Sequence, residues 1–137
     1  MAATDALKVG MKGQAELLVT DVLTAPRVGS GRVPVFATPM LINLFEAAAL
    51  DAVERHLPPG YQSLGTHLDM QHIAATPVGM RVYAEAELVA VDGRNLKFRV
   101  SARDEREPIG DGAHDRVVVN VERFDRRIQE KAAAVRR

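Results

Sequence analysis

The longest apolar stretch of the chain is 36-FATPMLINLFEAAALDAVERHL-57, whose first three turns as a helix would hold only two polar residues, Asn43 and Glu46. It opens with a helix-start signal, because Thr38 can cap free N–H groups and Pro39 loses no hydrogen bond at the first helical position. A PPG sequence, through which a helix cannot continue, follows it. The pattern predicts a helix of about 19 residues that begins at a Thr38 cap and is buried on most sides.

The rest of the chain alternates polar and apolar residues, which is typical of strands with one buried face. The alternation predicts strands at 14–23, 64–75, 80–91, 95–104 and 115–124. Gly- and Pro-rich loops separate them at 24–36, 76–79 and 107–112, and 92-DGRN-95 is a hairpin signal. The buried face of 64–75 is expected to carry Thr66, Leu68, Met70 and His72, and that of 115–124 Val117, Val119 and Val121. A short C-terminal helix closes the chain.

One strand, one long apolar helix and four strands joined mainly by short turns predict an α+β fold. Short turns make the strands antiparallel neighbours. A helix this apolar needs a sheet curved around it, which is the arrangement of a hotdog fold, and we expect residues 1–137 to form one such domain. One sheet layer cannot cover every side of the helix. We therefore expect at least a homodimer, with a tetramer left open.

The composition limits which partners and which kinds of site the protein is expected to have. The 18 basic and 18 acidic residues balance, and two Tyr, four Phe and no Trp offer little surface for base stacking, so we expect no nucleic-acid partner. With no Cys and four scattered His, we expect neither a metal site nor a cofactor. Nothing resembles a signal peptide, and no apolar run reaches the ~18 residues of a membrane span. We expect a cytoplasmic protein with no membrane partner.

The carboxylate of Glu46 is the first candidate functional group. A charged Glu among apolar residues is costly unless it is paired, hydrogen-bonded or protonated. Asn43 lies three residues earlier, hence on the same helix face. Two interpretations stay open. Glu46 is either a structural residue at a dimer interface or solvent channel, bonded to Asn43 or to backbone, or a reactive carboxylate in a dry pocket with a pKa tuned by burial.

Thr38 and His72 are the other candidates. Thr38 is either simply the helix cap or, with the N–H groups of Met40 and Leu41, part of a site for a carbonyl oxygen that becomes an oxyanion. His72 is either a hydrogen-bonded core residue or a catalyst. Eight helical residues put Thr38 about 12 Å from Glu46 along the helix axis, a gap that could hold a substrate carbonyl and a water. The remaining histidines are expected to be solvated: His56, His67 and His114.

These candidates lie in 36-FATPMLINLFEAAALDAV-53 and 64-LGTHLDMQHIAATPVGM-80, which resemble the fluoroacetyl-CoA thioesterase family of hotdog proteins. The stretches 87-ELVAVDGRNLKFRVSARDE-105 and 109-IGDGAHDRVVV-119 resemble it too, and the similarity covers roughly residues 8–131. Two features depart from the family. The loop 27-RVGSGRVPVF-36 is shorter and richer in Gly than a Phe-bearing lid, and Pro39 stands where the namesake has Gly.

The resemblance implies a homodimeric thioesterase that hydrolyses a short or medium acyl-CoA thioester with Thr38, Glu46 and His72 as a triad. It also implies a substrate contact from the backbone N–H of Gly65 and an arginine near the substrate at Arg116. Two residues of the helix complete the set expected to bind substrate: Met40 and Asn43.

Other functions remain open beside this one. A non-catalytic dimer that binds or senses acyl-CoA would keep the same pocket without consuming thioester. A purely structural dimer would contain the buried Glu46 but bind no ligand. A hotdog hydratase is least favoured, because 58-PPGYQSLG-65 holds neither the Asp nor the His that such enzymes place there.

Overall fold

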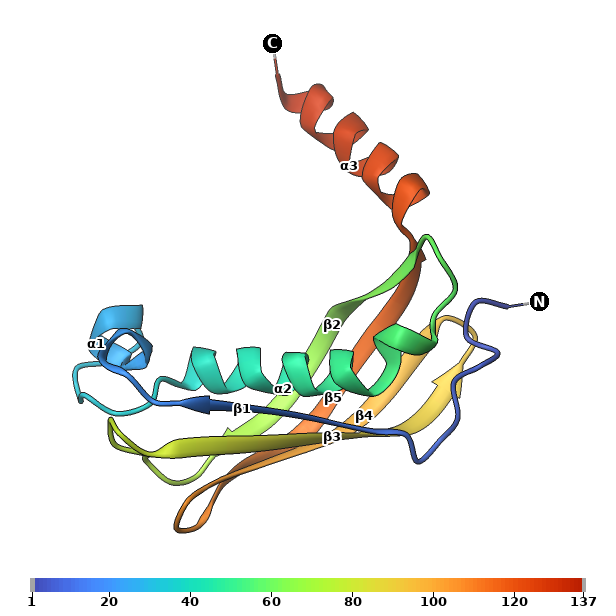
Figure 1. The fold of residues 1–137 in the computed structure, drawn as a ribbon. Coiled ribbons are helices and arrows are strands. Elements are labelled where there is room, and N and C mark those ends of the chain that lie inside the picture. The colour runs from blue at the N-terminus through green and yellow to red at the C-terminus, as the bar shows by residue number, and fades with distance from the viewer. Residues whose placement is uncertain (1, 137) are drawn as a thin grey trace.

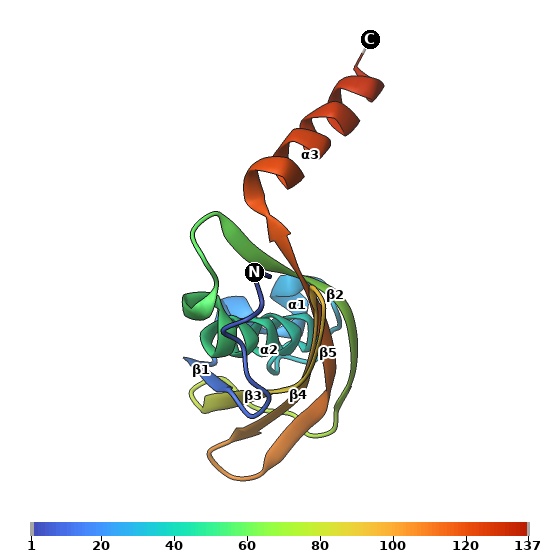
Figure 2. The same cartoon turned by 90° about the vertical axis from the view of Figure 1, so that its right-hand side faces the viewer.

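The computed structural model describes residues 2–136 and shows a five-stranded antiparallel sheet curved around one helix (Figure 1). Viewed from the side, the sheet forms an open half-barrel with the helix in its hollow (Figure 2). The order in the sheet is β1-β3-β4-β5-β2, so β1 and β2 are its edges. This is the hotdog arrangement that the sequence predicts. The strands are β1 (Lys12–Leu18), β2 (Tyr61–His72), β3 (Arg81–Asp92), β4 (Asn95–Asp104) and β5 (Pro108–Asn120).

The helix α2 (Thr38–Val53) lies in the hollow because one of its faces is apolar throughout. It approaches β1 closely, and a Cβ at Gly13 would collide with backbone atoms of Ala48 and Ala52. The opposite face of α2 is not covered by the sheet: Asn43 is exposed and Glu46 is half-buried. The prediction of burial on most sides is therefore wrong for the single chain. The buried residues are Leu41, Leu44, Phe45, Ala48, Ala49, Ala52 and Val53.

Both ends of α2 differ from the prediction. Ala37 is the N-cap residue and Thr38 is the first helical residue, so the predicted Thr38 cap is wrong. The carbonyl of Ala37 accepts from the N–H groups of Met40 and Leu41. The hydroxyl of Thr38 is therefore left for a partner outside the helix. At the other end, α2 stops at Val53 and a 3₁₀ turn, η2 (Glu54–His56), follows.

Alternation places the central strands correctly. The hairpin between β3 and β4 turns at Gly93, which has a φ of 61° that suits glycine. The inward side chains of both strands are buried: Val82, Ala84, Ala86 and Leu88 on β3, and Leu96, Phe98, Val100 and Ala102 on β4. The first strand starts earlier than predicted, at Lys12, and the segment predicted as a loop at 24–36 contains a short helix. That helix is α1 (Ala25–Val28), and a 3₁₀ turn, η1 (Asp21–Leu23), precedes it.

The prediction for the last strand is wrong in its start and in its phase. β5 begins at Pro108, and its glycines allow close contact with β2 rather than a turn, since a Cβ at Gly112 would collide with backbone atoms of Asp69 and Met70. The buried side chains of β5 near its end are His114, Arg116 and Val118, not the valines at 117, 119 and 121. His114, expected to be solvated, is 2% exposed.

The turn between β4 and β5 is built on the buried carboxylate of Asp104. This carboxylate accepts hydrogen bonds from Thr76 Oγ1 at 2.9 Å and from the N–H groups of Arg106 and Glu107 at 2.8 and 2.9 Å. Burial alone would raise the pKa of Asp104. These hydrogen bonds and the charge of Arg103 outweigh burial and hold the pKa below its ordinary value.

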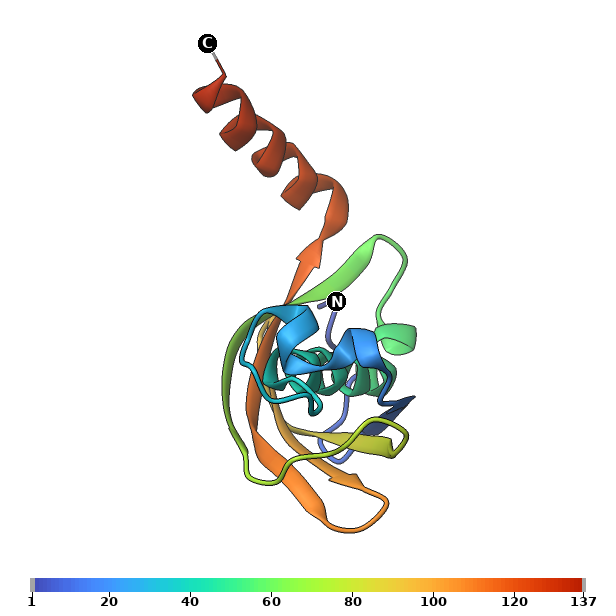
Figure 3. The same cartoon turned by 90° about the vertical axis from the view of Figure 1, so that its left-hand side faces the viewer.

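The C-terminal helix α3 (Val121–Val135) follows β5 directly and projects away from the sheet (Figures 1 and 3). Its N-cap is Asn120, whose side chain accepts from the N–H of Arg123 at 3.0 Å. No residue of α3 is buried. Between residues 2 and 136, the structure contains no helix with the length and apolar character needed to cross a membrane.

Candidate active site

Two groups of polar side chains lie along α2, one at its first residue and one near its middle. At the first residue, Thr38 Oγ1 and His72 Nδ1 are 2.7 Å apart, a hydrogen-bond distance. Thr38 begins α2 and His72 is the last residue of the edge strand β2. The fold therefore brings together two candidates that are 34 residues apart in the chain.

The surroundings of His72 favour the neutral form of its imidazole. Burial lowers its pKa, although the nearby Ala74 backbone acts in the opposite direction. The ring of Phe36 packs edge-on against it, with centroids 6.3 Å apart. Within the described residues, the Nε2 atom of His72 is buried and has no hydrogen-bond partner. Leaving a buried polar atom unpaired costs about 1–3 kcal/mol, so this nitrogen is well suited to a bound ligand.

A cavity of about 310 Å³ opens beside Thr38 and His72. Arg32 is the only charged residue among those that line it. A larger hollow of about 760 Å³ lies over β1, β3 and β4 and is lined by none of the candidate residues. The smaller cavity is therefore the better candidate for the substrate. Its other lining residues are small or apolar: Ala25, Ser30, Gly31, Val33, Val35, Phe36, Ile73, Ala74 and Ala75.

The carboxylate of Glu46 belongs to the second group. Within residues 2–136 it makes no hydrogen bond to Thr38, His72 or Asn43. Glu46 Oε2 instead forms an ion pair with Arg116 Nη1 at 3.2 Å. The side chain of Glu46 is 42% exposed and that of Arg116 is 5% exposed. Glu46 thus faces a buried cation on one side and is open on the other, so this chain alone does not form the dry pocket.

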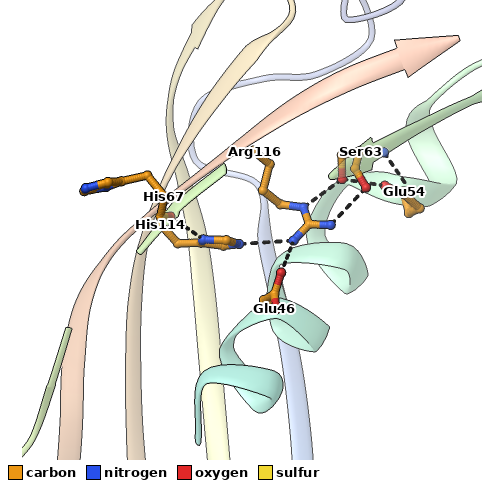
Figure 4. Close-up of polar contacts among 6 residues, drawn as sticks. All are labelled: Glu46, Glu54, Ser63, His67, His114 and Arg116. Carbon is orange, nitrogen blue, oxygen red and sulfur yellow. Dashed lines mark hydrogen bonds and ion pairs between the residues drawn. The ribbon is translucent and has the colours of Figure 1, made fainter. Parts of the chain in front are cut away.

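The guanidinium of Arg116 is the centre of a buried polar network (Figure 4). Arg116 Nε donates to Ser63 Oγ at 2.8 Å, and Nη2 donates to the Ser63 carbonyl at 3.0 Å. Ser63 in turn donates from its N–H and its hydroxyl to the two carboxylate oxygens of Glu54, both at 3.1 Å. The network therefore joins the end of α2 to its middle through β2 and β5.

His114 completes the network on the other side of Arg116. Its Nδ1 lies 2.8 Å from the carbonyl of His67, and its Nε2 lies 3.1 Å from Arg116 Nη1. A carbonyl and a guanidinium fix the tautomer, because Nδ1 must donate and Nε2 must accept. Burial lowers the pKa of His114 and the charge of Arg116 lowers it further, against the opposing effects of the His67 hydrogen bond and of nearby carboxylates.

Gly65 leaves the space that Glu46 occupies. A Cβ at Gly65 would lie 2.5 Å from Glu46 Oε2 and 3.2 Å from His114 Cε1. The pairing of β2 with β5 shifts register between Gly65 and His67, and at this bulge the His67 carbonyl meets His114. The bulge also explains why Thr66 is exposed, although the alternation predicts that it shares the buried face.

The sequence missed three residues of this region: Ser63, His114 and Glu54. The alternation of β5 could have indicated His114, because it lies two residues from Arg116 and so shares its face. No sequence pattern indicates the Ser63–Glu54 contact. Of the expected substrate-binding residues, Met40 is half-buried and packs against the core, and Asn43 is exposed. Within the described part of the chain, no three His, Cys, Asp or Glu residues are grouped so that they could hold a metal ion.

Comparison with known proteins identifies a family for this arrangement. Residues 19–122 match the family described as fluoroacetyl-CoA-specific thioesterase. The chain is 44% identical over 100 residues to the fluoroacetyl-CoA thioesterase of Streptantibioticus cattleyicolor, which covers 73% of this chain and 72% of the relative.

Solved structures agree with this match. A crystal structure of a mutant of the fluoroacetyl-CoA-specific thioesterase FlK has a TM-score of 0.86 and 36% identity, over 93% of this chain and 98% of that one. A complex of the same mutant enzyme with fluoroacetate and CoA has a TM-score of 0.81 and 37% identity, over 86% and 99%. A Thermus thermophilus thioesterase-superfamily protein has a TM-score of 0.85 and 27% identity, over 95% and 98%.

Proposed function

Because the chain belongs to the fluoroacetyl-CoA-specific thioesterase family, whose members are thioester hydrolases, we propose that it hydrolyses a short or medium acyl-CoA thioester with Thr38, Glu46 and His72. The observation that carries this proposal is the 2.7 Å hydrogen bond between Thr38 and His72, at the N-terminus of α2 and in the wall of a mostly apolar cavity. The related enzyme bound to fluoroacetate and CoA supports a CoA ester as the ligand.

The thioester carbonyl lies at the N-terminus of α2, where the helix dipole stabilises developing negative charge. The N–H groups of Met40 and Leu41, which the sequence suggested as donors, already donate to the Ala37 carbonyl. The N–H of Thr38 has no backbone partner within residues 2–136. Thr38 therefore offers its N–H to the carbonyl oxygen, its hydroxyl donates to His72 Nδ1, and Met40 contributes apolar contact.

Glu46 acts on the carbonyl carbon in one of two ways. It either takes a proton from an attacking water or attacks directly to form an anhydride that water then opens. In both routes the C–S bond breaks, the CoA thiolate takes a proton, and a carboxylic acid and free CoA are formed. His72 orients the thioester by donating a hydrogen bond from its otherwise unpaired Nε2–H, and the thiolate takes the proton that the water releases.

A homodimer would complete the site. β2 is an edge strand of 12 residues, and no strand of residues 2–136 pairs with its outer side. Such an edge is a template for a second strand, and a two-fold pairing of two copies through β2 would bring the partner next to the open side of Glu46. The expected oligomer is measurable by light scattering, and a monomer that hydrolyses thioesters at full rate would contradict this part of the proposal.

The function is tested by thiol release from acyl-CoA esters, from acetyl to decanoyl with phenylacetyl included. Glu46→Ala is compared with the parent and with Glu130→Ala, an exposed Glu on α3. Release that disappears only in Glu46→Ala supports the proposal. Glu46→Gln at the parent's turnover would contradict both roles of Glu46.

A non-catalytic dimer that binds acyl-CoA is the second candidate, and one observation favours it. Glu46 makes no direct contact with Thr38 or His72 within the described chain, so the three residues do not form a connected triad there. A folded dimer that binds acyl-CoA esters by calorimetry but releases no thiol from any of them would establish this alternative.

A further inference from the structure

The burial of Arg116 sets a constraint on its role. A buried guanidinium is costly unless its N–H groups are bonded and its charge is balanced. Arg116 has five N–H donors. Four of its contacts are internal: two to Ser63, one to Glu46 and one to His114. The guanidinium is therefore committed to the protein itself rather than open to a ligand.

The balance of charge points to Glu46. Among residues 2–136, the only carboxylate within ion-pair distance of Arg116 is that of Glu46, at 3.2 Å. Glu54 reaches Arg116 only through Ser63, whose hydroxyl accepts from Arg116 and donates to Glu54. His114 has to stay neutral, because a second ring proton would face the guanidinium. The charged or titratable groups around His114 are Arg116 and Asp115 on β5 and Glu46 on α2.

We propose that Ser63, Glu54 and His114 fix Arg116, and that Arg116 is a positioning residue that holds the carboxylate of Glu46 at the reacting centre. This proposal rests on the proposed function, since it deepens the role of Glu46. Arg116 acts through Glu46 and not by contact with the acyl group. Glu54 belongs to the same support although it lies two helical turns from Glu46, because Ser63 connects it to the guanidinium.

The test separates positioning from substrate binding by the kinetic constant that changes. Arg116→Lys keeps the charge but loses the planar set of donors, and Glu54→Gln keeps the shape but loses the charge. We expect kcat to fall about 10- to 100-fold in Arg116→Lys, with KM within about twofold, because a misplaced carboxylate affects the transition state. Glu54→Gln changes kcat in the same direction by a smaller factor. Arg99→Lys, on the exposed side of β4, is the matched control.

Either of two kinetic outcomes overturns the proposal. A raised KM with unchanged kcat would make Arg116 a substrate-binding group, and parent kinetics with a lower melting temperature would make the network merely structural. The ¹³C NMR signal of the Glu46 carboxylate, measured in the parent and in both variants without substrate, gives an independent readout. If the parent releases no thiol, the proposed function fails, and an unchanged Glu46 signal in Arg116→Lys would separately reject the positioning role.

A second and independent observation concerns Arg32. It lines the cavity beside Thr38 and His72 and is the only charged residue among the lining residues. Within the described residues it makes no ion pair. The loop that carries it is held at both ends, because Ala25 N–H donates to the Val35 carbonyl and Phe36 N–H donates to the Thr76 carbonyl. Arg32 is itself exposed, and a cation beside an otherwise uncharged cavity favours a ligand with an anionic group.

We infer that Arg32 selects CoA esters through an anion, either a carboxylate at the end of the acyl chain or a phosphate of CoA. This inference also rests on the proposed function. The acyl carboxylate fits better, because the cavity shares Thr38 and His72 with the site of the thioester carbonyl. The predicted substrate class is therefore the monothioester of a short dicarboxylic acid.

The test compares malonyl-, succinyl- and glutaryl-CoA with acetyl- and butyryl-CoA, in the parent, Arg32→Gln and the exposed control Arg94→Gln. A loss of about tenfold or more in kcat/KM for the carboxylated esters alone supports the acyl carboxylate. An equal loss for all CoA esters, but not for the same thioesters of N-acetylcysteamine, which lack phosphate, supports a CoA phosphate. Unchanged kcat/KM and unchanged calorimetric Kd for every ester would overturn the inference, whether or not thioester is hydrolysed.

Discussion

Replacing Gly65 by Ala should lower turnover without weakening the fold. The added Cβ would lie 2.5 Å from Glu46 Oε2, about 0.9 Å short of ordinary contact at 3.4 Å. The atom in the way is the end of a flexible side chain, so the carboxylate moves and the backbone does not. A misplacement of about 1 Å at a reacting group costs about 100-fold in rate, or about 2.7 kcal/mol in the activation free energy. We therefore expect kcat to fall about 100-fold.

The free energy of unfolding of the same variant should change little, because a gain in backbone entropy opposes the cost of lengthening the Glu46–Arg116 ion pair. Glycine in a strand costs about 0.5–1 kcal/mol relative to Ala through backbone entropy, and the new methyl group needs only a small shift of the His114 ring, 3.2 Å away. Thiol release and urea unfolding are measured together, with Gln62→Ala as an exposed control on the same strand. Parent turnover in a folded Gly65→Ala variant would refute the position that we assign to the Glu46 carboxylate.

Three further predictions follow from the structure. Thr38→Ala should reduce turnover and cost about 0.5–1.5 kcal/mol in urea titrations, through the lost hydrogen bond to His72. Since Ala37 is the cap, the same substitution in a His72→Ala background should cost less than about 0.5 kcal/mol; a loss near the ~1 kcal/mol typical of a capping Thr would contradict this. Asp104→Asn should cost about 1–3 kcal/mol in the free energy of unfolding at pH 7. Ionised Asp104 stabilises the fold above pH 3.8, and this stabilisation is lost as the pH falls through the lower pKa of the folded state. The difference between parent and variant should therefore shrink in unfolding experiments at pH 3, and an undiminished difference would contradict the role of the carboxylate. Burial lowers the pKa values of His72 and His114 from 6.5, so the unfolded chain binds more protons than the folded chain. The melting temperature should therefore fall as the pH drops below about 6.5. A melting temperature that stays constant from pH 7.5 to 5.5 would be inconsistent with neutral, buried rings.

The sequence predicts the elements well where one period dominates. The alternation of β3 and β4 and the apolar stretch of α2 correctly give the half-barrel and its helix. The alternation rule fails for β5. Its valines alternate as the residues of a buried face would, but His114 and Arg116 occupy the interior. Alternation assumes that the polar face is the solvated one, and a buried charge network reverses that assumption.

The candidate site was predictable in part for a similar reason. Local signals marked Thr38 at the start of the helix and His72 near the end of a strand, but only the fold shows that they pair. The pairing of Glu46 with Arg116 depends on two residues 70 positions apart and on the missing side chain of Gly65. No local pattern encodes such a contact. The predicted Thr38 cap is wrong for a simple reason: the hydroxyl of Thr38 is bonded to His72 and not to the backbone of its own helix.

The separation of the Thr38–His72 pair from the Glu46–Arg116 pair has a consequence for thermodynamic coupling. Eight residues of helix, about 12 Å, lie between them, and mutations more than about 7–10 Å apart usually add in their effects on folding. Thr38→Ala and Arg116→Lys should therefore add in the free energy of unfolding. In the activation free energy they should not add, because both pairs act on one carbonyl. The difference between these two double-mutant cycles measures how far the substrate itself connects the two halves of the site.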